Sequence, residues 1–125
     1  MASVDSEFVL LMSELLAPLG QIRPRRMFGA VGLYCDGAFF AIISDDVLYL
    51  KGDAQTKDRF DAMAMKPFAV PSGRPMTLSY FEVPGEWLDE EEQLLEFAHM
   101  ALGAAHRAGT QKTTIKKKHA RSQSE

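Results

Sequence analysis

The stretch MFGAVGLYCDGAFFAIISDDVLYLK, residues 27–51, decides the fold. Runs of apolar, aromatic and β-branched residues are separated there by two short polar segments, Asp36-Gly37 and Ser44-Asp45-Asp46. Polar segments of this kind form the tight turns of β-hairpins. The stretch therefore predicts three antiparallel strands, at about 27–35, 38–44 and 47–51.

The second of these strands contains Phe39-Phe40-Ala41-Ile42-Ile43 and is apolar at every one of those positions. A strand buried on one face alone alternates apolar and polar residues, so both faces of this sheet are expected to be covered. If the helices cover one face, a second copy of the chain covers the other, since soluble monomers rarely expose large apolar patches. The prediction is a homodimer that buries either Phe39 and Ile43 or Phe40 and Ile42. The alternative is that the first and last helices cover opposite faces within one chain.

The segment before this sheet has the spacing of an amphipathic helix. Its apolar residues recur at steps of three and four, as one helix face requires: Val4, Phe8, Leu11, Met12, Leu15, Leu16 and Leu19. Ser3 or Asp5 is expected to cap this helix, and Pro18 followed by Gly20 ends it.

The segment after the sheet contains two further helices and more β structure. Asp53 is expected to cap a short helix that ends near Met65. A β region follows, with strands at 67–70 and 76–83 around a turn at 71–75. The last helix opens with Asp89 three residues before Glu92, as in a capping box, and ends at Gly109.

The predicted order is helix, three strands, helix, two strands, helix. This order favours the α+β class: a two-layer domain in which helices pack on an antiparallel five-stranded sheet. Residues 1–108 form this domain. Residues 109–125 contain one aliphatic residue, Ile115, and cannot offset their ordering entropy by burial, so we expect a disordered basic tail.

Length and composition exclude several classes of protein. A chain of 125 residues fits one domain and excludes a multidomain enzyme. Its one cysteine, Cys35, excludes an intramolecular disulfide framework and a thiolate zinc cluster, and favours a reducing compartment, the cytoplasm. Because no apolar run approaches the roughly 18 residues needed to span a bilayer, we expect no membrane insertion.

Charge is distributed unevenly along the chain. The formal net charge is −3, but residues 109–125 hold five Lys or Arg and one Glu, a net +4, which leaves −7 for residues 1–108. An acidic body does not attract a phosphate backbone, so contact with nucleic acid must start from the tail or from a local patch. The candidate residues are Arg25 and Arg26, beside Arg23, and Lys116, Lys117, Lys118 and Arg121.

Candidate catalytic and metal-binding groups are sparse. Cys35 would need His99 or His106, far along the chain, to act as a nucleophile. The two histidines have no third ligand near them in sequence, and the acidic run 89–92 suits the start of a helix. We therefore expect no catalytic residues, no metal and no cofactor.

Several motifs in order resemble the N-terminal domain of the TfoX/Sxy family of bacterial competence regulators, over about residues 5–107. They are Arg25-Arg26-Met27-Phe28-Gly29-Ala30-Val31-Gly32-Leu33-Tyr34, Asp36-Gly37, Phe40-Ala41-Ile42, Leu48-Tyr49-Leu50-Lys51, Gly73-Arg74-Pro75 and Tyr80-Phe81-Glu82-Val83-Pro84. The resemblance implies a fold like that of secretion chaperones and an accessory role in transcription or protein binding. Longer TfoX proteins carry a second, helical C-terminal domain, where this chain has its basic tail.

Three functional hypotheses follow. The first is a non-enzymatic regulatory domain that binds protein partners, including the transcription machinery. The second is a weak, direct nucleic-acid binder that uses the tail, with Arg25 and Arg26 as a secondary contact. The third is an enzyme with an unrecognised pocket lined by polar residues such as Tyr34, Lys51 and Tyr80.

Overall fold

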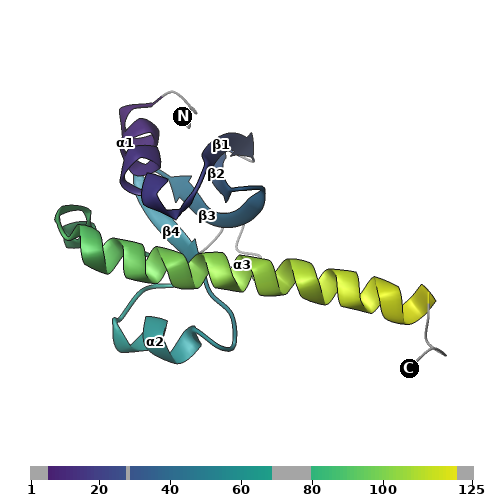
Figure 1. Ribbon diagram of the computed structural model, residues 1–125. Coiled ribbons are helices and arrows are strands. Elements are labelled where there is room, and N and C mark those ends of the chain that lie inside the picture. Colours follow the sequence, from purple (N-terminus) through teal and green to yellow (C-terminus); the bar gives the residue numbers. More distant parts are fainter. Residues whose placement is uncertain (1–5, 28, 69–79, 121–125) are drawn as a thin grey trace.

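The computed structural model describes residues 6–27, 29–68 and 80–120, with side chains to residue 109. The fold is α+β, as predicted: a five-stranded antiparallel sheet in the order β1-β2-β3-β4-β5, with three α-helices (Figure 1). The strands are β1 (Ile22–Met27), β2 (Ala30–Cys35), β3 (Ala38–Ser44), β4 (Val47–Lys51) and β5 (Tyr80–Glu82). The helices are α1 (Glu7–Leu15), α2 (Lys57–Ala62) and α3 (Glu91–Ala120), with 3₁₀ turns η1 (Ala17–Leu19) and η2 (Gly85–Asp89). Within the described residues, no helix is both long and apolar enough to cross a membrane.

The strands at the two edges of the sheet differ from the predicted ones. The expected first strand, 27–35, is divided between β1 and β2, which are joined through Gly29 at φ 80°. β1 was missed because its sequence, IRPRRM, has the proline and charges typical of an edge strand and no apolar alternation. Of the strands expected at 67–70 and 76–83, most lies outside the described residues; the described parts are β5 and an isolated bridge between Pro67 and Phe81.

The two predicted hairpin turns are confirmed. Asp36 and Gly37 have φ of 50° and 91°, and Asp45 and Asp46 have φ of 52° and 59°. Two successive positive φ values define the turn that matches the twist of paired strands, and Asp and Gly tolerate that conformation. β2, β3 and β4 therefore form a continuous meander.

A β-bulge on β3 decides which residues face the helices. Val31 pairs with Ile43 and Leu33 pairs with Ala41, but Tyr34 pairs with Phe39, so Phe40 is an extra residue in the ladder. Phe40 is fully buried in the same core cluster as Ile43. The sequence predicted that Phe39 would share a face with Ile43, or Phe40 with Ile42. Both pairings are wrong, because the bulge interrupts the alternation of side chains and places the two members of each pair on opposite faces.

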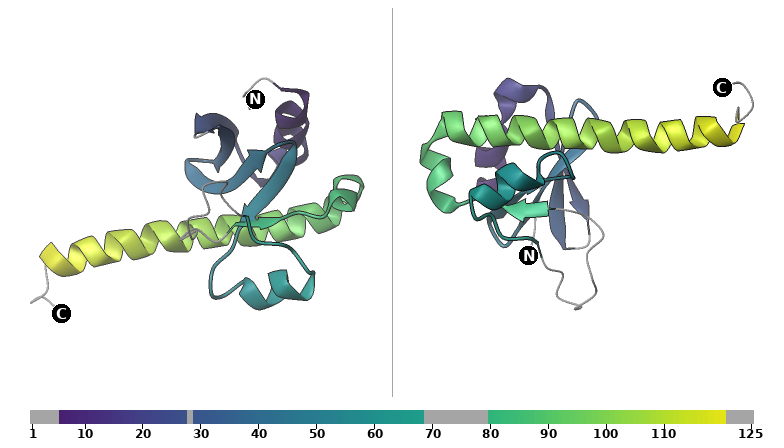
Figure 2. Two further views of the ribbon diagram at one scale, coloured as in Figure 1. Left: turned by 180° about the vertical axis from the view of Figure 1, so that it is seen from behind. Right: turned by 90° about the horizontal axis from the view of Figure 1, so that it is seen from below.

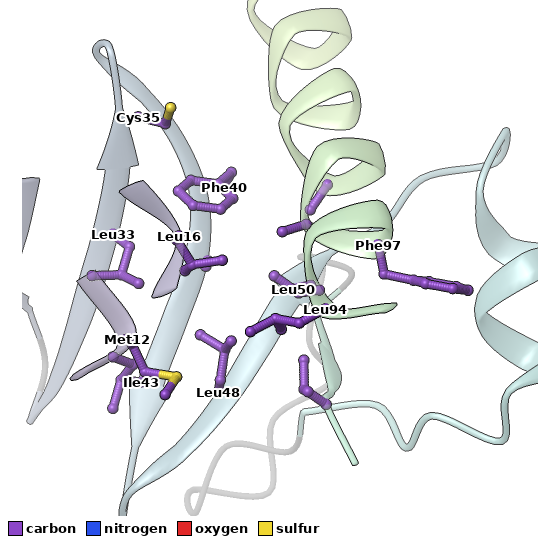
Figure 3. Packing of buried hydrophobic residues seen from close by; sticks show 14 of the residues in the cluster. Met12, Leu16, Leu33, Cys35, Phe40, Ile43, Leu48, Leu50, Leu94 and Phe97 are labelled. Carbon is purple, nitrogen blue, oxygen red and sulfur yellow. The ribbon is translucent and has the colours of Figure 1, made fainter. Parts of the chain in front are cut away.

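The core lies between the sheet and the helices. Figure 3 shows Phe40, Leu48 and Leu94 between the sheet and α3, with Met12 and Leu16 from the α1 region beside them. All three described α-helices contribute buried residues to this one cluster: Val9 from α1, Phe60 from α2 and Phe97 from α3 are examples. The alternative in which the first and last helices cover opposite faces of the sheet is therefore wrong.

The first helix starts and packs differently from the expectation. Ser6 is its N-cap, with the side-chain oxygen accepting a hydrogen bond of 3.1 Å from the backbone N–H of Val9. The expected caps, Ser3 and Asp5, lie outside the described residues. Leu11, expected on the buried face, is 43% exposed.

The last helix begins later and continues further than predicted. It starts at Glu91, because Gly85–Asp89 forms the 3₁₀ turn η2. It passes through Gly109, where we expected it to end and a disordered tail to begin, and continues to Ala120. An interior glycine costs about 1 kcal/mol relative to alanine, and a helix that is already nucleated can propagate through good helix formers such as Lys and Gln. The division into a domain, 1–108, and a tail, 109–125, stays a prediction.

Figure 2 shows that α3 extends well past the sheet, so its C-terminal part projects from the body of the molecule. Its N-terminal part packs on β3 and β4. α2 is expected from the sequence to be capped by Asp53 and to reach Met65, but it spans Lys57–Ala62, and Asp53 lies one turn earlier. That position gives Asp53 a different role, described below.

Candidate functional site

The face of the sheet opposite the helices carries a second set of apolar and aromatic side chains. Directly paired residues of neighbouring strands project to the same side, so Tyr34 and Phe39 share this face, as do Ile42 and Tyr49. Tyr80 contacts the ring of Phe39 and therefore belongs with them. We call these five residues, Tyr34, Phe39, Ile42, Tyr49 and Tyr80, the aromatic face. None of them belongs to the core cluster that the helices cover.

A row of rings and cations crosses the aromatic face from β1 to β5. The Arg25 guanidinium lies 5.9 Å from the centre of the Tyr34 ring, and the Tyr34 and Phe39 rings are stacked at 5.0 Å. Phe39 lies 5.6 Å from Tyr80, and the Lys51 ammonium lies 5.2 Å from the Tyr80 ring centre. Cations over ring faces are attracted to the electron density of the ring. The row therefore has a positive group at each end.

Gly32 makes room for this row. A side-chain carbon added at Gly32 would lie 2.8 Å from the Phe39 ring and 2.7 Å from the terminal methyl of Met27. Both neighbours therefore pack directly over the β2 backbone. The glycine lets Phe39 lie flat enough to stack on Tyr34, and this explains a glycine inside a strand.

The Tyr34 ring has two close neighbours. Phe39 lies nearly parallel to it, at 22°, and the Arg25 guanidinium lies over it. Tyr34 and Phe39 are both partly buried, and Arg23 and Arg25 are exposed. A partner that approaches this surface would therefore meet two partly exposed rings and the guanidinium groups of β1.

The polar residues named for the enzyme hypothesis, Tyr34, Lys51 and Tyr80, come together on the aromatic face. Tyr80 is 1% exposed, and its hydroxyl has no hydrogen-bond partner among the described residues. Burial raises the pKa of Tyr80, and the nearby Tyr34 raises it further. Lys51 lies over the ring of Tyr80. Tyr80 therefore stays protonated at neutral pH.

The arginines predicted as binding residues lie on an edge strand rather than in a loop. Successive residues of a strand project to opposite sides, so Arg25 and Arg26 point in opposite directions. Arg25 pairs with Gly32 and lies on the aromatic side, whereas Arg26 pairs with Val31 on the helix side. Arg23 pairs with Tyr34 and shares the side of Arg25. The sequence-based cluster is therefore divided, and Arg23 takes the place of Arg26.

The basic residues of the C-terminal segment lie elsewhere in the structure. Lys116, Lys117 and Lys118 belong to the projecting end of α3, a different element from β1 (Figure 1). Arg121 lies outside the described residues. The structure therefore does not bring the two sets of predicted binding residues onto one element.

Cys35 and the histidines do not form a nucleophilic site. Cys35 is buried in the core, and burial, followed by the charge of Asp36, raises the pKa of its thiol. A catalytic cysteine needs a lowered pKa instead. His99 and His106 are exposed on α3. No group of three or more potential metal ligands occurs within the described ranges.

An ion pair that no sequence pattern indicated holds α3 against the segment between β4 and α2. Arg107 donates two hydrogen bonds to the carboxylate of Asp53, at 2.7 and 3.1 Å. The same carboxylate accepts hydrogen bonds from the backbone N–H groups of Gln55 and Thr56. The hydrogen bond from Arg107 is the main cause of the lowered pKa of Asp53. The two partners are 54 residues apart, and no local sequence signal links them.

Two open hollows border α3. One has a volume of about 450 Å³ and is lined by Gln55, Thr56, His99, Met100, Leu102, Gly103, His106 and Arg107. The other is lined by Glu90, Glu91, Glu92, Gln93 and Glu96 at the start of the helix. Neither includes Tyr34, Lys51 or Tyr80, the residues that an enzymatic pocket was expected to use.

Comparison with known proteins places the chain among a defined set of relatives. The family described as TfoX N-terminal domain matches residues 14–105. The DNA transformation protein TfoX1 of Aliivibrio fischeri is 31% identical over 85 residues, which cover 67% of this chain and 41% of that protein. Protein Sxy of Escherichia coli strain K12 is 30% identical over 108 residues, which cover 84% of this chain and 51% of that protein. The chain thus matches about half of the length of these relatives.

Proposed function

The chain belongs to the TfoX N-terminal domain family, and we propose that it is a non-enzymatic domain that binds a protein partner in the regulation of bacterial transcription or competence. The name of one relative, a DNA transformation protein, supports the link to competence. Family membership alone does not fix a function, so the proposal also needs support from a surface of this chain.

The aromatic face is the observation that carries the proposal. The described helices pack on one side of the sheet, and the other side carries Tyr34 and Phe39, both partly exposed. Apolar and aromatic side chains that a fold leaves outside its core favour contact with another molecule. The edge strand β1 adds exposed arginines, which are also common at protein interfaces.

The chemistry of the titratable groups supports the non-enzymatic part of the proposal. The pKa values of Cys35 and Tyr80 are raised by burial, which disfavours the reactive anionic forms of both groups. The lowered pKa of Asp53 is explained by its structural pair with Arg107. Burial or ion pairing therefore explains the shifted pKa values of these three groups.

Deleting the gene in the bacterium that carries this chain tests the proposal. We expect a change in a defined set of transcripts, together with altered uptake of DNA, and restoration of both by the wild-type chain. Unchanged transcripts and unchanged DNA uptake in the deletion strain would rule out the regulatory role.

A second candidate function is direct binding of nucleic acid through the C-terminal segment. The specific observation in its favour is that α3 continues as a helix through the basic residues Lys116, Lys117 and Lys118. Titration of labelled duplex DNA at increasing salt concentration tests it, since a polybasic contact weakens steeply with salt. Binding that is absent at about 50 mM salt, or unchanged after deletion of residues 110–125, excludes this candidate.

Self-association stays a prediction, with its surface corrected. The bulge at Phe40 places Phe39 and Ile42 together on the aromatic face. Ile42 is already buried in the single chain, so a dimer through the helix-free side would cover Phe39. Light scattering at increasing concentration tests this prediction. A mass that stays at 13.9 kDa excludes the homodimer.

A further inference from the structure

One end of the aromatic face is strongly basic. Arg23 and Arg25 are two residues apart on β1, point to the same side and are exposed. Within the described ranges, neither of them takes part in a salt bridge; Arg25 instead lies over the Tyr34 ring. Two guanidinium groups thus stand beside two partly buried aromatic rings. We call Arg23, Arg25, Tyr34 and Phe39 the basic strip.

The remaining charges on this side of the sheet do not neutralise the basic strip. Lys51 adds a further cation at the Tyr80 end of the row. Glu82 pairs with Tyr49 and lies on β5, at the edge of the sheet opposite β1. Together with Asp45, Glu82 raises the pKa of Tyr49, after the larger effect of burial. Glu82 and Asp45 therefore lie by Tyr49. At the start of β1, the Asp36 carboxylate accepts a hydrogen bond of 3.0 Å from the backbone N–H of Gln21, and Arg23 and Arg25 place two positive charges against this one carboxylate.

We propose that the basic strip binds an acidic segment of a protein partner. This inference rests on the proposed function and names the chemistry of its partner. Carboxylates pair with the planar, bidentate guanidinium groups of Arg23 and Arg25. Apolar side chains of the same segment pack on the exposed parts of the Tyr34 and Phe39 rings, which provide the buried area at the centre of the contact.

The ring geometry argues against nucleic acid as the occupant. Bases bind to sheet surfaces by stacking on exposed ring faces. Here the Arg25 guanidinium lies over the Tyr34 ring, 5.9 Å from its centre, and Phe39 stacks on the same ring at 5.0 Å, so Tyr34 already has neighbours where a base would stack.

The charge distribution disfavours one of the two ways in which a second copy could cover the row. A two-fold axis in such an interface places each end of the row either against the same end or against the opposite end. In the first arrangement Arg23 and Arg25 face their own copies, whereas in the second they face the end that carries both Lys51 and Glu82. An acidic partner removes the repulsion between the arginines.

Nuclear magnetic resonance titration of the full chain tests the inference. The probe is a synthetic peptide of alternating Glu and Leu residues, and the matched control peptide has Gln in place of Glu. We expect shifts of the backbone amides of β1 and β2 with the Glu peptide, a salt-dependent affinity, and at least about tenfold weaker binding of the Gln peptide.

Two charge reversals on the same strand provide matched variants. Arg25→Glu is expected to weaken binding of the Glu peptide at least about tenfold, whereas Arg26→Glu, on the other side of the sheet, is expected to change it less than about twofold. Arg25→Gln removes the charge without reversing it and should give an intermediate loss. Because Arg25 is exposed, its variants are expected to keep the amide spectrum of a folded chain.

The inference is wrong if the Glu peptide shifts no amides of β1 and β2, or if the Glu and Gln peptides bind with equal affinity. It is also wrong if Arg25→Glu and Arg26→Glu change the affinity for the Glu peptide equally. Tighter binding of single-stranded oligothymidine at the same amides would overturn it too. Shifts of the β1 and β2 amides on concentration without peptide assign the strip to a second copy and overturn it as well. None of these outcomes depends on the transcript levels of the deletion strain. A wrong assignment of the partner's chemistry can therefore be distinguished from a wrong assignment of the regulatory role.

Discussion

Two neighbouring phenylalanines of β3 lie on opposite sides of the sheet and have opposite surroundings. Phe40 is fully buried among residues of the sheet and the helices, whereas Phe39 is partly exposed and stacks on Tyr34. The bulge that makes Phe40 an extra residue places it on the helix side together with Ile43. The comparison shows that one apolar strand can place a side chain in the core on one face and leave its neighbour partly exposed on the other.

The helix side should be the more sensitive to truncation. Phe40→Ala removes a fully buried ring from the core and should lower the free energy of unfolding by about 3–5 kcal/mol. Urea unfolding followed by circular dichroism measures this loss. A loss below about 1 kcal/mol would mean that the helix-covered face does not hold the fold together.

The aromatic side should tolerate the same change better. Phe39→Ala removes contacts with Tyr34 and Tyr80 from a partly exposed position, and we expect a loss of about 1–2 kcal/mol. The same urea experiment applies, with Phe40→Ala as the matched variant. Equal losses for the two variants would remove the distinction between the faces.

The ion pair between Asp53 and Arg107 fixes α3 on the helix side. Arg107→Met should lower the free energy of unfolding by about 1 kcal/mol at pH 7, because the pair is only partly buried. The lowered pKa of Asp53 means that the pair stabilises the fold at neutral pH and that this contribution is lost as the pH falls through that pKa.

The difference between the wild type and Arg107→Met should therefore shrink between pH 7 and about pH 3. Lys57→Met, which removes the exposed pair with Asp61, is the control and should have little effect. A difference that is independent of pH would show that Arg107 stabilises the fold through packing alone.

The cap of α1 provides the smallest test of the helix side. Ser6→Ala removes the hydrogen bond to the Val9 N–H and should cost about 0.5–1 kcal/mol. Ser6→Asp keeps an acceptor at the cap and should restore most of the loss. If both variants match the wild type in thermal unfolding, the cap does not stabilise the helix that covers the sheet.

The sequence predicted the parts of the fold that have strong local signals. Asp36-Gly37 and Asp45-Asp46 have the residue types that positive φ requires, so both hairpins were located correctly. The edge strand β1 was missed because exposed arginines and Pro24 resemble a loop, and edge strands carry such residues to prevent aggregation. The α+β class was still predicted correctly, because the hairpins and the flanking helices determine it.

The candidate site was less predictable because it depends on register and on contacts distant in sequence. The bulge at Phe40 leaves no clear sequence signal, and it decides whether Phe39 or Phe40 enters the core. Arg25 and Arg26 are adjacent in sequence but project to opposite sides of the sheet. This difference can be predicted only if β1 is recognised as a strand. The Asp53–Arg107 pair joins segments 54 residues apart.

Complementation of the deletion strain by Phe39→Ala tests the central claim, that the sheet has one face for the core and one for a partner. The measurement is the level of the regulated transcripts at equal cellular amounts of variant and wild-type protein. We expect Phe39→Ala to remain folded and to fail to restore those transcripts. Full restoration by this variant would contradict the assignment of the aromatic face to partner binding.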